Sequence, residues 1–152
     1  MTAEHVINGA SAITLTHGGR RQSTSVRIDD QRNDLAILTV AGPSSAGLTV
    51  SAQHPHPGQQ AVFIGYPEGG PQQVGAATVA GGVAMPSPGL STGNLYLRPG
   101  YRLQSEVRPG NSGGPLLNTS GAVIGVIDAR SLVGGDVGYA ITAEPLLADL
   151  AR

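Results

Sequence analysis

The chain has 152 residues, a formal net charge of −1 and no cysteine. This length fits one domain with a hydrophobic core, and the charge offers no electrostatic footprint for nucleic acid or acidic membranes. The absence of cysteine excludes disulfides, thiolate catalysis and Cys-ligated zinc. Twenty-three glycines, eleven prolines and 12% charged residues indicate short strands joined by many turns, which favours an all-β barrel or sandwich.

The first third of the sequence predicts a hairpin followed by a buried strand. Residues 12–16 and 23–28 alternate apolar and polar residues on either side of a turn at residues 17–20. The apolar run at residues 35–40 fits a buried strand, and residues 48–50 fit a short one. Asp34 therefore stands at the start of a buried strand, where a carboxylate needs a partner such as an imidazole N–H.

Two histidines mark the middle of the chain, in the segment Gln53-His54-Pro55-His56-Pro57. Their spacing invites a metal-site interpretation, but neither an acid nor a cysteine lies beside them, and the prolines hold the segment extended. We therefore interpret this segment as a solvated linker between two halves of the chain and expect no metal or organic cofactor.

The second half predicts further strands and one helix. Strands are expected at residues 61–66 and 74–83, followed by a loop to about residue 93, and at 95–107 with a break at Pro99-Gly100. A hairpin is expected from residues 116–117 and 122–127, and a last strand at 137–141. Thr142 is positioned to cap a short terminal helix that has Pro145 in its first turn.

The stretch from Glu106 to Pro115 reads Glu-Val-Arg-Pro-Gly-Asn-Ser-Gly-Gly-Pro. Glycines on both sides of Ser112 permit positive φ and a close approach of backbone to a ligand. Such a turn exposes the serine hydroxyl and can aim the N–H groups of Gly110 and Ser112 at one developing oxyanion. The alternative is an ordinary glycine-rich surface turn that contains a serine.

A serine nucleophile needs a base and an orienting carboxylate, and His5 and Asp34 can supply them. The resulting chain order is His, Asp, Ser. Residues 110–114 also match the Gly-x-Ser-x-Gly elbow of α/β-hydrolases, in which the histidine comes last. No histidine follows Ser112, the last being His56, so the sequence excludes that fold.

At this point the chain resembles the trypsin-like, chymotrypsin-fold serine proteases, especially the bacterial HtrA/Deg branch and the related membrane-anchored MarP-type proteases of actinobacteria. The resemblance covers almost the whole chain. It rests on four segments: residues 2–6 (Thr-Ala-Glu-His-Val), 33–36 (Asn-Asp-Leu-Ala), 108–116 (Arg-Pro-Gly-Asn-Ser-Gly-Gly-Pro-Leu) and 138–141 (Gly-Tyr-Ala-Ile).

The resemblance implies an all-β fold of two Greek-key, six-stranded β-barrels followed by a short C-terminal helix. It implies a single protease domain over 1–152, with a partial N-terminal barrel at 1–52 and a C-terminal barrel plus helix at 60–152. The implied activity is hydrolysis of polypeptides through an acyl-enzyme, with His5 as base, Asp34 as orienting acid and Ser112 as nucleophile.

The resemblance also implies a primary substrate pocket walled by residues near Glu106, Asp128, Ala129 and Gly138. An acid six residues before the nucleophile favours basic substrates by charge pairing. The alternative is that Glu106 pairs with Arg102 or Arg108, or faces solvent.

The sequence departs from the family before His5, where two further strands are usual. We therefore expect an incomplete first barrel and suspect a fragment of a longer protein, in which a signal or membrane anchor would precede this segment. The resemblance implies an extracytoplasmic location, periplasmic or secreted. The alternative function is a catalytically impaired, protease-like domain that binds extended peptides at a strand edge.

Overall fold

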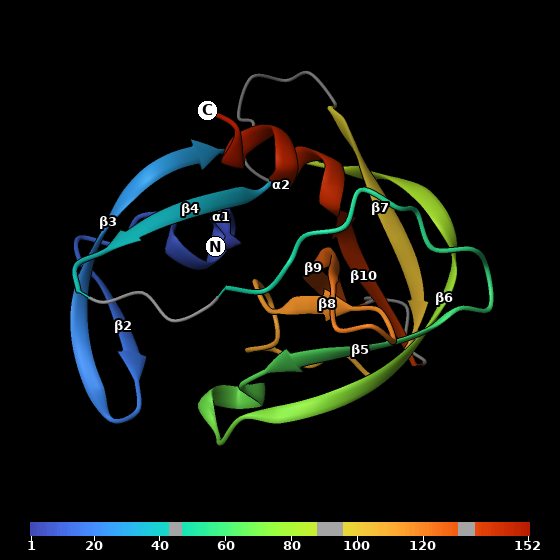
Figure 1. The fold of residues 1–152 in the computed structure, drawn as a ribbon, viewed down its shortest axis with the longest axis horizontal. Helices are drawn as coiled ribbons and strands as arrows, with labels where there is room; N and C mark the ends of the chain where they lie inside the picture. The colour runs from blue at the N-terminus through green and yellow to red at the C-terminus, as the bar shows by residue number, and fades with distance from the viewer. Residues whose placement is uncertain (43–46, 88–95, 131–135) are drawn as a thin grey trace.

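The computed structural model describes residues 1–42, 47–87, 96–130 and 136–152. Its strands form an open four-stranded sheet and a closed six-stranded barrel, and every strand pairing is antiparallel (Figure 1). A short helix ends the chain. The predicted all-β class, with an incomplete first barrel, a second barrel and a terminal helix, is confirmed.

The open sheet has the order β1-β4-β3-β2. Its elements are β1 (Thr2–Ala3), β2 (Ile13–His17), β3 (Arg20–Asp30) and β4 (Leu35–Val40). The hairpin predicted from alternation and the buried strand predicted from the apolar run are confirmed. The sequence pattern did not predict β1 or the one-turn helix α1 (Glu4–Ile7), around which the sheet curls in Figure 1.

The barrel closes in the order β10-β7-β6-β5-β8-β9. Its strands are β5 (Gln60–Gly65), β6 (Gln73–Pro86), β7 (Leu97–Gln104), β8 (Pro115–Leu117), β9 (Val123–Arg130) and β10 (Val137–Thr142). A 3₁₀ turn, η1 (Pro67–Gly69), lies between β5 and β6, and helix α2 (Ala143–Leu150) follows β10. No helix in the described ranges is long and apolar enough to cross a membrane.

Three local predictions need correction. Strand β7 runs unbroken through Pro99-Gly100, because Pro99 pairs only with β6 while the β10 register stops at Gly100. A side chain at Gly100 would collide with Met85 and with the Ala140 carbonyl, so glycine permits the close approach of these strands. Residues 48–50 form no strand, and only a parallel bridge joins Val50 to Val123.

The third correction concerns the helix cap. Thr142 occupies the N-cap position of α2, but its buried hydroxyl makes no cap hydrogen bond and has no partner among the described residues. The loop predicted after Pro86 falls largely at residues 88–93, outside the described residues.

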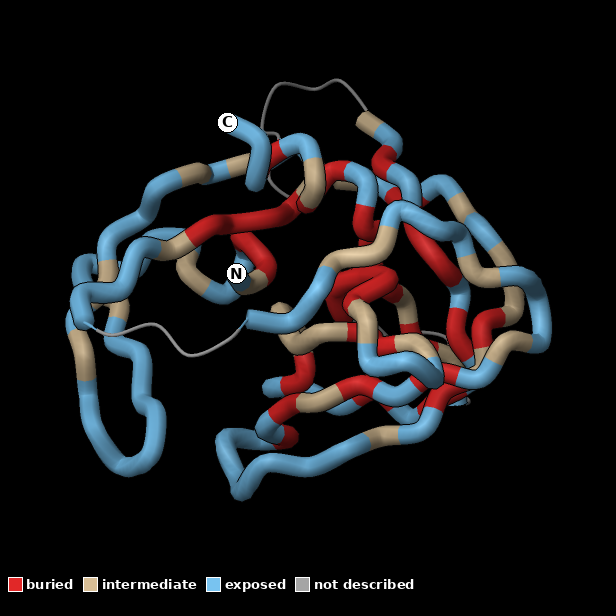
Figure 2. Tube along the Cα trace, in the orientation of Figure 1, coloured by how far each residue is buried: buried red, intermediate tan, exposed pale blue. Residues whose placement is uncertain are grey.

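Two apolar clusters hold the molecule together. Figure 2 shows buried segments throughout the barrel but only a short buried stretch in the open sheet. The first fills the barrel and draws all its members from residues 61–140, including Leu103 and Ile127. The second joins the two units, because Leu35 and Ile37 of β4 pack with barrel residues and with Leu146 of α2. The sheet is therefore buried only along the seam where it meets the barrel.

Candidate active site

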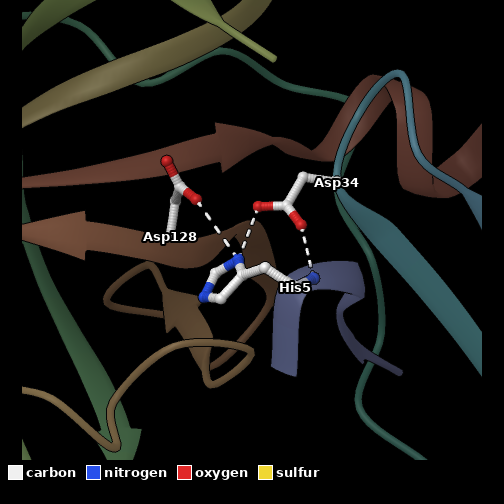
Figure 3. Close-up of side chains that lie close together, drawn as sticks. All are labelled: His5, Asp34 and Asp128. Atoms are coloured by element: carbon white, nitrogen blue, oxygen red, sulfur yellow. Dashed lines mark hydrogen bonds and ion pairs between the residues drawn. The ribbon is translucent and has the colours of Figure 1, made fainter. Parts of the chain in front are cut away.

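His5 and Asp34 lie in direct contact at this seam, although 29 residues separate them. The ring N–H at His5 Nδ1 donates to Asp34 Oδ2 at 2.8 Å, and the His5 backbone N–H donates to Asp34 Oδ1, also at 2.8 Å. Figure 3 shows the Nδ1 side of the imidazole facing Asp34, with the other ring nitrogen pointing away from the carboxylate. The ring is thus held in one orientation, with Nε2 left as the nitrogen able to accept a proton.

The backbone at Asp34 is unusual, because its φ of 58° lies in the left-handed region. Only a few per cent of non-glycine residues adopt it, with aspartate and asparagine over-represented. The preceding turn is tied by Asn33, whose amide donates to Asp30 Oδ1 at 3.0 Å, and the Asp34 carbonyl accepts the Glu4 amide at 3.1 Å. These bonds turn the fully buried carboxylate of Asp34 toward α1.

The Ser112 loop is pinned to β9 and to the N-terminal segment. Gly113 N–H donates to the Ile127 carbonyl, and Ile127 N–H donates to the Gly114 carbonyl, both at 2.8 Å. Gly113 has φ 82°, and a Cβ on it would collide with Thr2 and Ala3. Glycine at this position therefore lets the residues just before His5 lie directly against the serine loop.

Ser112 and His5 contact the same residue, Asp128 of β9, from different directions. Ser112 Oγ donates to the Asp128 carbonyl at 2.7 Å, and His5 Nδ1 lies 4.0 Å from Asp128 Oδ1. Between the described residues Ser112 and His5 themselves, the structure has no hydrogen bond. The Ser112 hydroxyl is thus directed at the carbonyl of a residue whose carboxylate lies near His5.

The peptide joining Pro109 to Gly110 has a fixed direction. Its carbonyl, that of Pro109, accepts the Glu68 amide at 2.7 Å, and the Gly110 carbonyl accepts the Tyr66 amide at 3.3 Å. The bond is trans, so the Gly110 N–H points opposite to the Pro109 carbonyl, away from η1. Within the described ranges, the N–H groups of Gly110 and Ser112 donate to no protein acceptor.

Sequence reasoning missed Arg98 and the role of the Asp128 carboxylate. Arg98 is 3% exposed, and its guanidinium donates from Nη1 to Asp34 Oδ2 at 3.1 Å and from Nη2 to Asp128 Oδ2 at 3.0 Å. Alternation gave no signal for Arg98, because it is out of phase with the buried Tyr101 and Leu103 of the same strand. Burial switches phase at Gly100, which is buried next to Tyr101.

The contacts set the charge state of the site. The hydrogen bond to Asp34 raises the pKa of His5 above its ordinary value, although partial burial opposes this shift. Burial by itself would raise the pKa of Asp34, but the side-chain and backbone hydrogen bonds from His5 outweigh it and hold that pKa low. Burial raises the pKa of Asp128, against the lowering effect of Arg98. The site therefore favours an ionised Asp34 beside a readily protonated imidazole.

One donor set in the described residues has the composition of a metal site, because single atoms of His5, Asp34 and Asp128 lie within 4.8 Å of one another. The guanidinium of Arg98 already pairs with both carboxylates, and His5 Nδ1 is committed to Asp34. The cation that this acidic pair needs is thus supplied by the protein itself, and we interpret the set as an ion-pair network.

The four pocket residues predicted from the resemblance lie on different segments: Glu106 follows β7, Asp128 and Ala129 lie on β9, and Gly138 lies on β10. Glu106 is exposed and pairs with Arg108 at 2.8 Å, and it lines a cavity of about 230 Å³ with residues of β5 and β6. The Asp128 carboxylate faces Arg98 and His5, away from this cavity. Gly138 is buried in β10 opposite Leu103. Ala129 pairs with Tyr139, and its side chain lies outside the described part.

His54 is tied down, although we interpreted its segment as a solvated linker. Its ring nitrogens lie 3.0 Å from the Tyr101 hydroxyl and 3.1 Å from Glu144 Oε1. Burial and the charge of Glu144 raise the pKa of Tyr101 to about 12, so the hydroxyl stays protonated. His54 thus anchors the linker to β7 and α2.

Comparison with known sequences identifies relatives along the whole chain. A family model described as a trypsin-like peptidase domain matches residues 1–126. Serine protease Rv3671c of Mycobacterium tuberculosis is 28% identical over 153 residues, which cover 100% of this chain and 38% of that protein. A probable periplasmic serine endoprotease, DegP-like, of Hahella chejuensis is 33% identical over 128 residues, covering 83% of this chain and 26% of that protein. The chain thus spans well under half the length of these relatives.

Solved structures of similar proteins share the fold. The active form of the M. tuberculosis Rv3671c protease has a TM-score of 0.93 at 28% identity, covering 99% of this chain and 67% of that chain. The inactive form of the same protease has a TM-score of 0.87, with 99% and 76% covered. The HtrA-type protease AlgW with a decapeptide gives 0.83 at 26% identity, with 99% and 46% covered. With the family model spanning most of its length, the chain belongs to the trypsin-like peptidase family, and it is similar to serine proteases of the HtrA and Rv3671c type.

Proposed function

We propose that this chain is a serine endopeptidase that hydrolyses peptide bonds through His5, Asp34 and Ser112 and a covalent acyl-enzyme. The observation that carries the proposal is the double hydrogen bond between His5 and Asp34, formed across 29 residues beside the Ser112 loop. A buried carboxylate that orients an imidazole next to a serine in a glycine turn is the arrangement that activates a hydroxyl nucleophile. The higher TM-score to the active form of the Rv3671c protease supports the same proposal.

The mechanism follows from the orientation of the ring. With its Nδ1 proton donated to Asp34, His5 accepts the Ser112 hydroxyl proton at Nε2 as the oxygen bonds to the peptide carbonyl carbon. The imidazolium then gives this proton to the leaving amine when the C–N bond breaks. Water then attacks the acyl carbon while His5 Nε2 takes one of its protons. His5 gives this proton to Ser112 Oγ as the ester bond breaks, and the other water proton leaves with the released carboxylic acid. Rotation of the hydroxyl away from the Asp128 carbonyl starts the cycle.

Stabilisation of the oxyanion is assigned to the N–H groups of Gly110 and Ser112. The bond between the Pro109 carbonyl and the Glu68 amide supports this assignment, because it turns the Gly110 N–H away from η1 before substrate binds. Preorganised donors of this kind contribute about 10² to 10³ in turnover each.

Polypeptides are the proposed substrates, as the crystallisation of AlgW with a decapeptide suggests for a related protein. The ion pair between Glu106 and Arg108 favours the alternative in which Glu106 does not select basic residues. We therefore expect a cleavage profile over a peptide library without enrichment of Arg or Lys before the scissile bond, and strong enrichment would restore Glu106 as a pocket acid.

We also propose an extracytoplasmic location, periplasmic or secreted. The relative from Hahella chejuensis is named as a probable periplasmic endoprotease, which supports this assignment. Fractionation of cells that express the whole gene, with the protein followed by antibody, tests it.

The enzymatic proposal is tested with casein and a quenched fluorescent peptide library. We expect hydrolysis by the wild type and none above background by Ser112→Ala, with fold integrity of both checked by circular dichroism. Equal rates for the two proteins would contradict the proposal.

A peptide-binding module without cleavage is the second candidate. One observation favours it: the Ser112 hydroxyl donates to the Asp128 carbonyl and not to His5. Fluorescence anisotropy with the same peptides, over the time in which cleavage is followed by mass spectrometry, separates the two. Saturable binding by the wild type with no product would select this candidate.

A further inference from the structure

We propose that Arg98 and Asp128 are positioning residues for His5 and Asp34, acting as a compensated pair in which Arg98 fixes the orienting carboxylate and Asp128 restores the negative charge that Arg98 cancels. The inference rests on the proposed function for its catalytic consequence. The effect of the two residues on the charge of His5 is measured separately, in a protein that lacks the Ser112 hydroxyl.

The geometry of Arg98 makes it a bracket between the two units. From β7 of the barrel, its Nη1 donates to Asp34 Oδ2 at 3.1 Å and also to the Asn33 carbonyl at 3.0 Å. One nitrogen therefore holds both the side chain of Asp34 and the peptide just before it, at the residue whose φ is 58°. A buried guanidinium that bonds a strained turn in this way fixes the direction of the carboxylate.

The bonds of Asp34 leave little freedom for its carboxylate. Oδ1 accepts the His5 backbone N–H, and Oδ2 accepts hydrogen bonds from both His5 Nδ1 at 2.8 Å and Arg98 Nη1 at 3.1 Å. The side chain of Asp34 is fully buried, and that of Arg98 is 3% exposed, so water does not compete for these bonds. The position of the imidazole is thus set through Asp34 by a residue of the opposite unit.

Charge balance explains why Asp128 accompanies Arg98. Arg98 and Asp34 alone sum to zero, which would remove the negative charge that favours a protonated His5. Asp128 pairs with Arg98 at 3.0 Å and lies 4.0 Å from His5 Nδ1, so the three groups together carry one net negative charge. Figure 3 shows the two carboxylates on the same side of the ring.

The ionisable groups that face His5 come from four segments of the chain, and each of them affects the pKa of the imidazole. Asp34 stands at the start of β4, Arg98 lies on β7, Asp128 on β9, and Glu4 precedes His5 on α1. Glu4 is buried, and burial together with the charges of Asp29 and Asp34 raises its pKa. Because Glu4 stays unchanged in every variant below, differences between variants report on the Arg98 and Asp128 pair.

The test measures the titration of the four histidines by NMR in the inactive Ser112→Ala background, with His5 assigned by its loss in His5→Gln. In Asp128→Asn the titration midpoint of His5 should fall by about one pH unit, because an opposite charge near the ring is lost. In the double variant Arg98→Met with Asp128→Asn it should return to within about half a unit of the wild-type midpoint. Arg102→Met is the matched control, an exposed arginine on the same strand, and should leave His5 unchanged.

An Asp128→Asn midpoint equal to that of the wild type would overturn the proposal. If Asp128→Asn does not fold, the double variant decides, since an uncompensated buried arginine is removed in it. Failure of the double variant to fold, or a His5 midpoint displaced by more than about half a unit, would then contradict the compensation of charge.

Kinetics connects this result to the proposed function. In proteins with Ser112 intact, the acid limb of the kcat/KM profile should move with the His5 midpoint, and the double variant should recover the wild-type limb. If the wild type cleaves no peptide, the peptidase assignment is refuted, while the NMR titration still decides the roles of Arg98 and Asp128.

Discussion

The closed barrel and the open sheet differ in where their buried side chains lie. The barrel has an apolar cluster drawn entirely from its own strands. In the sheet, β2 and β3 contain no buried residue, and burial is confined to β1, α1, Asp34 and the first half of β4. The sheet therefore obtains its core from the barrel, through the packing of Leu35 and Ile37 against barrel residues and α2.

The candidate active site lies at the boundary between the barrel, which has its own apolar core, and the sheet, which does not. Ser112 belongs to a loop bonded to β9 of the barrel, whereas His5 lies on α1 and Asp34 lies directly before β4, on the side of the open sheet. The proposed peptide hydrolysis therefore depends on the seam between sheet and barrel, while most of the free energy of folding comes from the barrel.

The largest predicted effect is a loss of turnover on substitution of Asp34, which lies at the seam between sheet and barrel. Asp34→Asn keeps a residue that tolerates positive φ but presents an amide to His5, which favours the wrong tautomer. We expect turnover to fall about 10⁴-fold with the fold retained. Peptide hydrolysis and circular dichroism measure the two quantities.

Asp29→Asn is the matched control, an exposed aspartate on β3, and it should retain full activity. A loss of less than about tenfold in Asp34→Asn would mean that Asp34 does not orient the base.

A substitution in each unit sharpens the stability contrast. Leu103→Ala, at a fully buried position of the barrel cluster, should lower the free energy of unfolding by about 2 to 5 kcal/mol. Leu15→Ala, at a position 40% exposed on β2, should change it by no more than about 0.5 kcal/mol. Urea titration followed by circular dichroism measures both, and equal losses would show that the sheet has a core of its own.

The contact between the serine loop and the N-terminal segment can be broken at one glycine. Gly113 and Gly121 have nearly equal φ values, 82° and 80°, but a Cβ at Gly113 meets Thr2 and Ala3 whereas one at Gly121 meets nothing within 4 Å. Gly113→Ala should therefore destabilise the protein by about 1 to 3 kcal/mol more than Gly121→Ala.

Activity distinguishes the same two variants. Gly113→Ala should also reduce kcat/KM, because it pushes the residues before His5 away from Ser112, while Gly121→Ala should keep it. Equal activity in the two would show that this contact does not position the histidine.

The smallest effect is a pH dependence in the barrel's helix. Asp149 of α2 is 3% exposed and burial raises its pKa, so the folded state binds a proton more readily than the unfolded state. The stability of the wild type relative to Asp149→Asn should then increase as pH falls from 7 through the raised pKa toward the ordinary value of 3.8. Urea midpoints of both proteins at pH 7 and pH 5 measure it, and a relative decrease would contradict the sign.

Much of this fold could be predicted because its strands obey local patterns. Residues 35–40 were predicted from a short apolar run, and β4 has these bounds. The break predicted at Pro99-Gly100 was wrong, since whether a proline ends a strand depends on which neighbours need its N–H, and that is a tertiary property.

Some residues of the candidate site could likewise be predicted from the sequence, and others could not. His5, Asp34 and Ser112 could be proposed from residue types and chain order, and His5 and Asp34 are bonded to each other. Arg98 could not be proposed, because its burial depends on a barrel strand passing the sheet, and the role of the Asp128 carboxylate depends on Arg98. Charge pairs between distant segments leave no periodic signal in a sequence.

The most direct test of the central claim is the rate at which a fluorophosphonate probe labels Ser112. If His5 of the sheet activates Ser112 of the barrel, the wild type and the control His17→Gln should react at the same rate. His5→Gln should react at least about 100-fold more slowly, and Ser112→Ala should not react. Labelling of His5→Gln at the wild-type rate, or equal labelling of Ser112→Ala, would contradict the account.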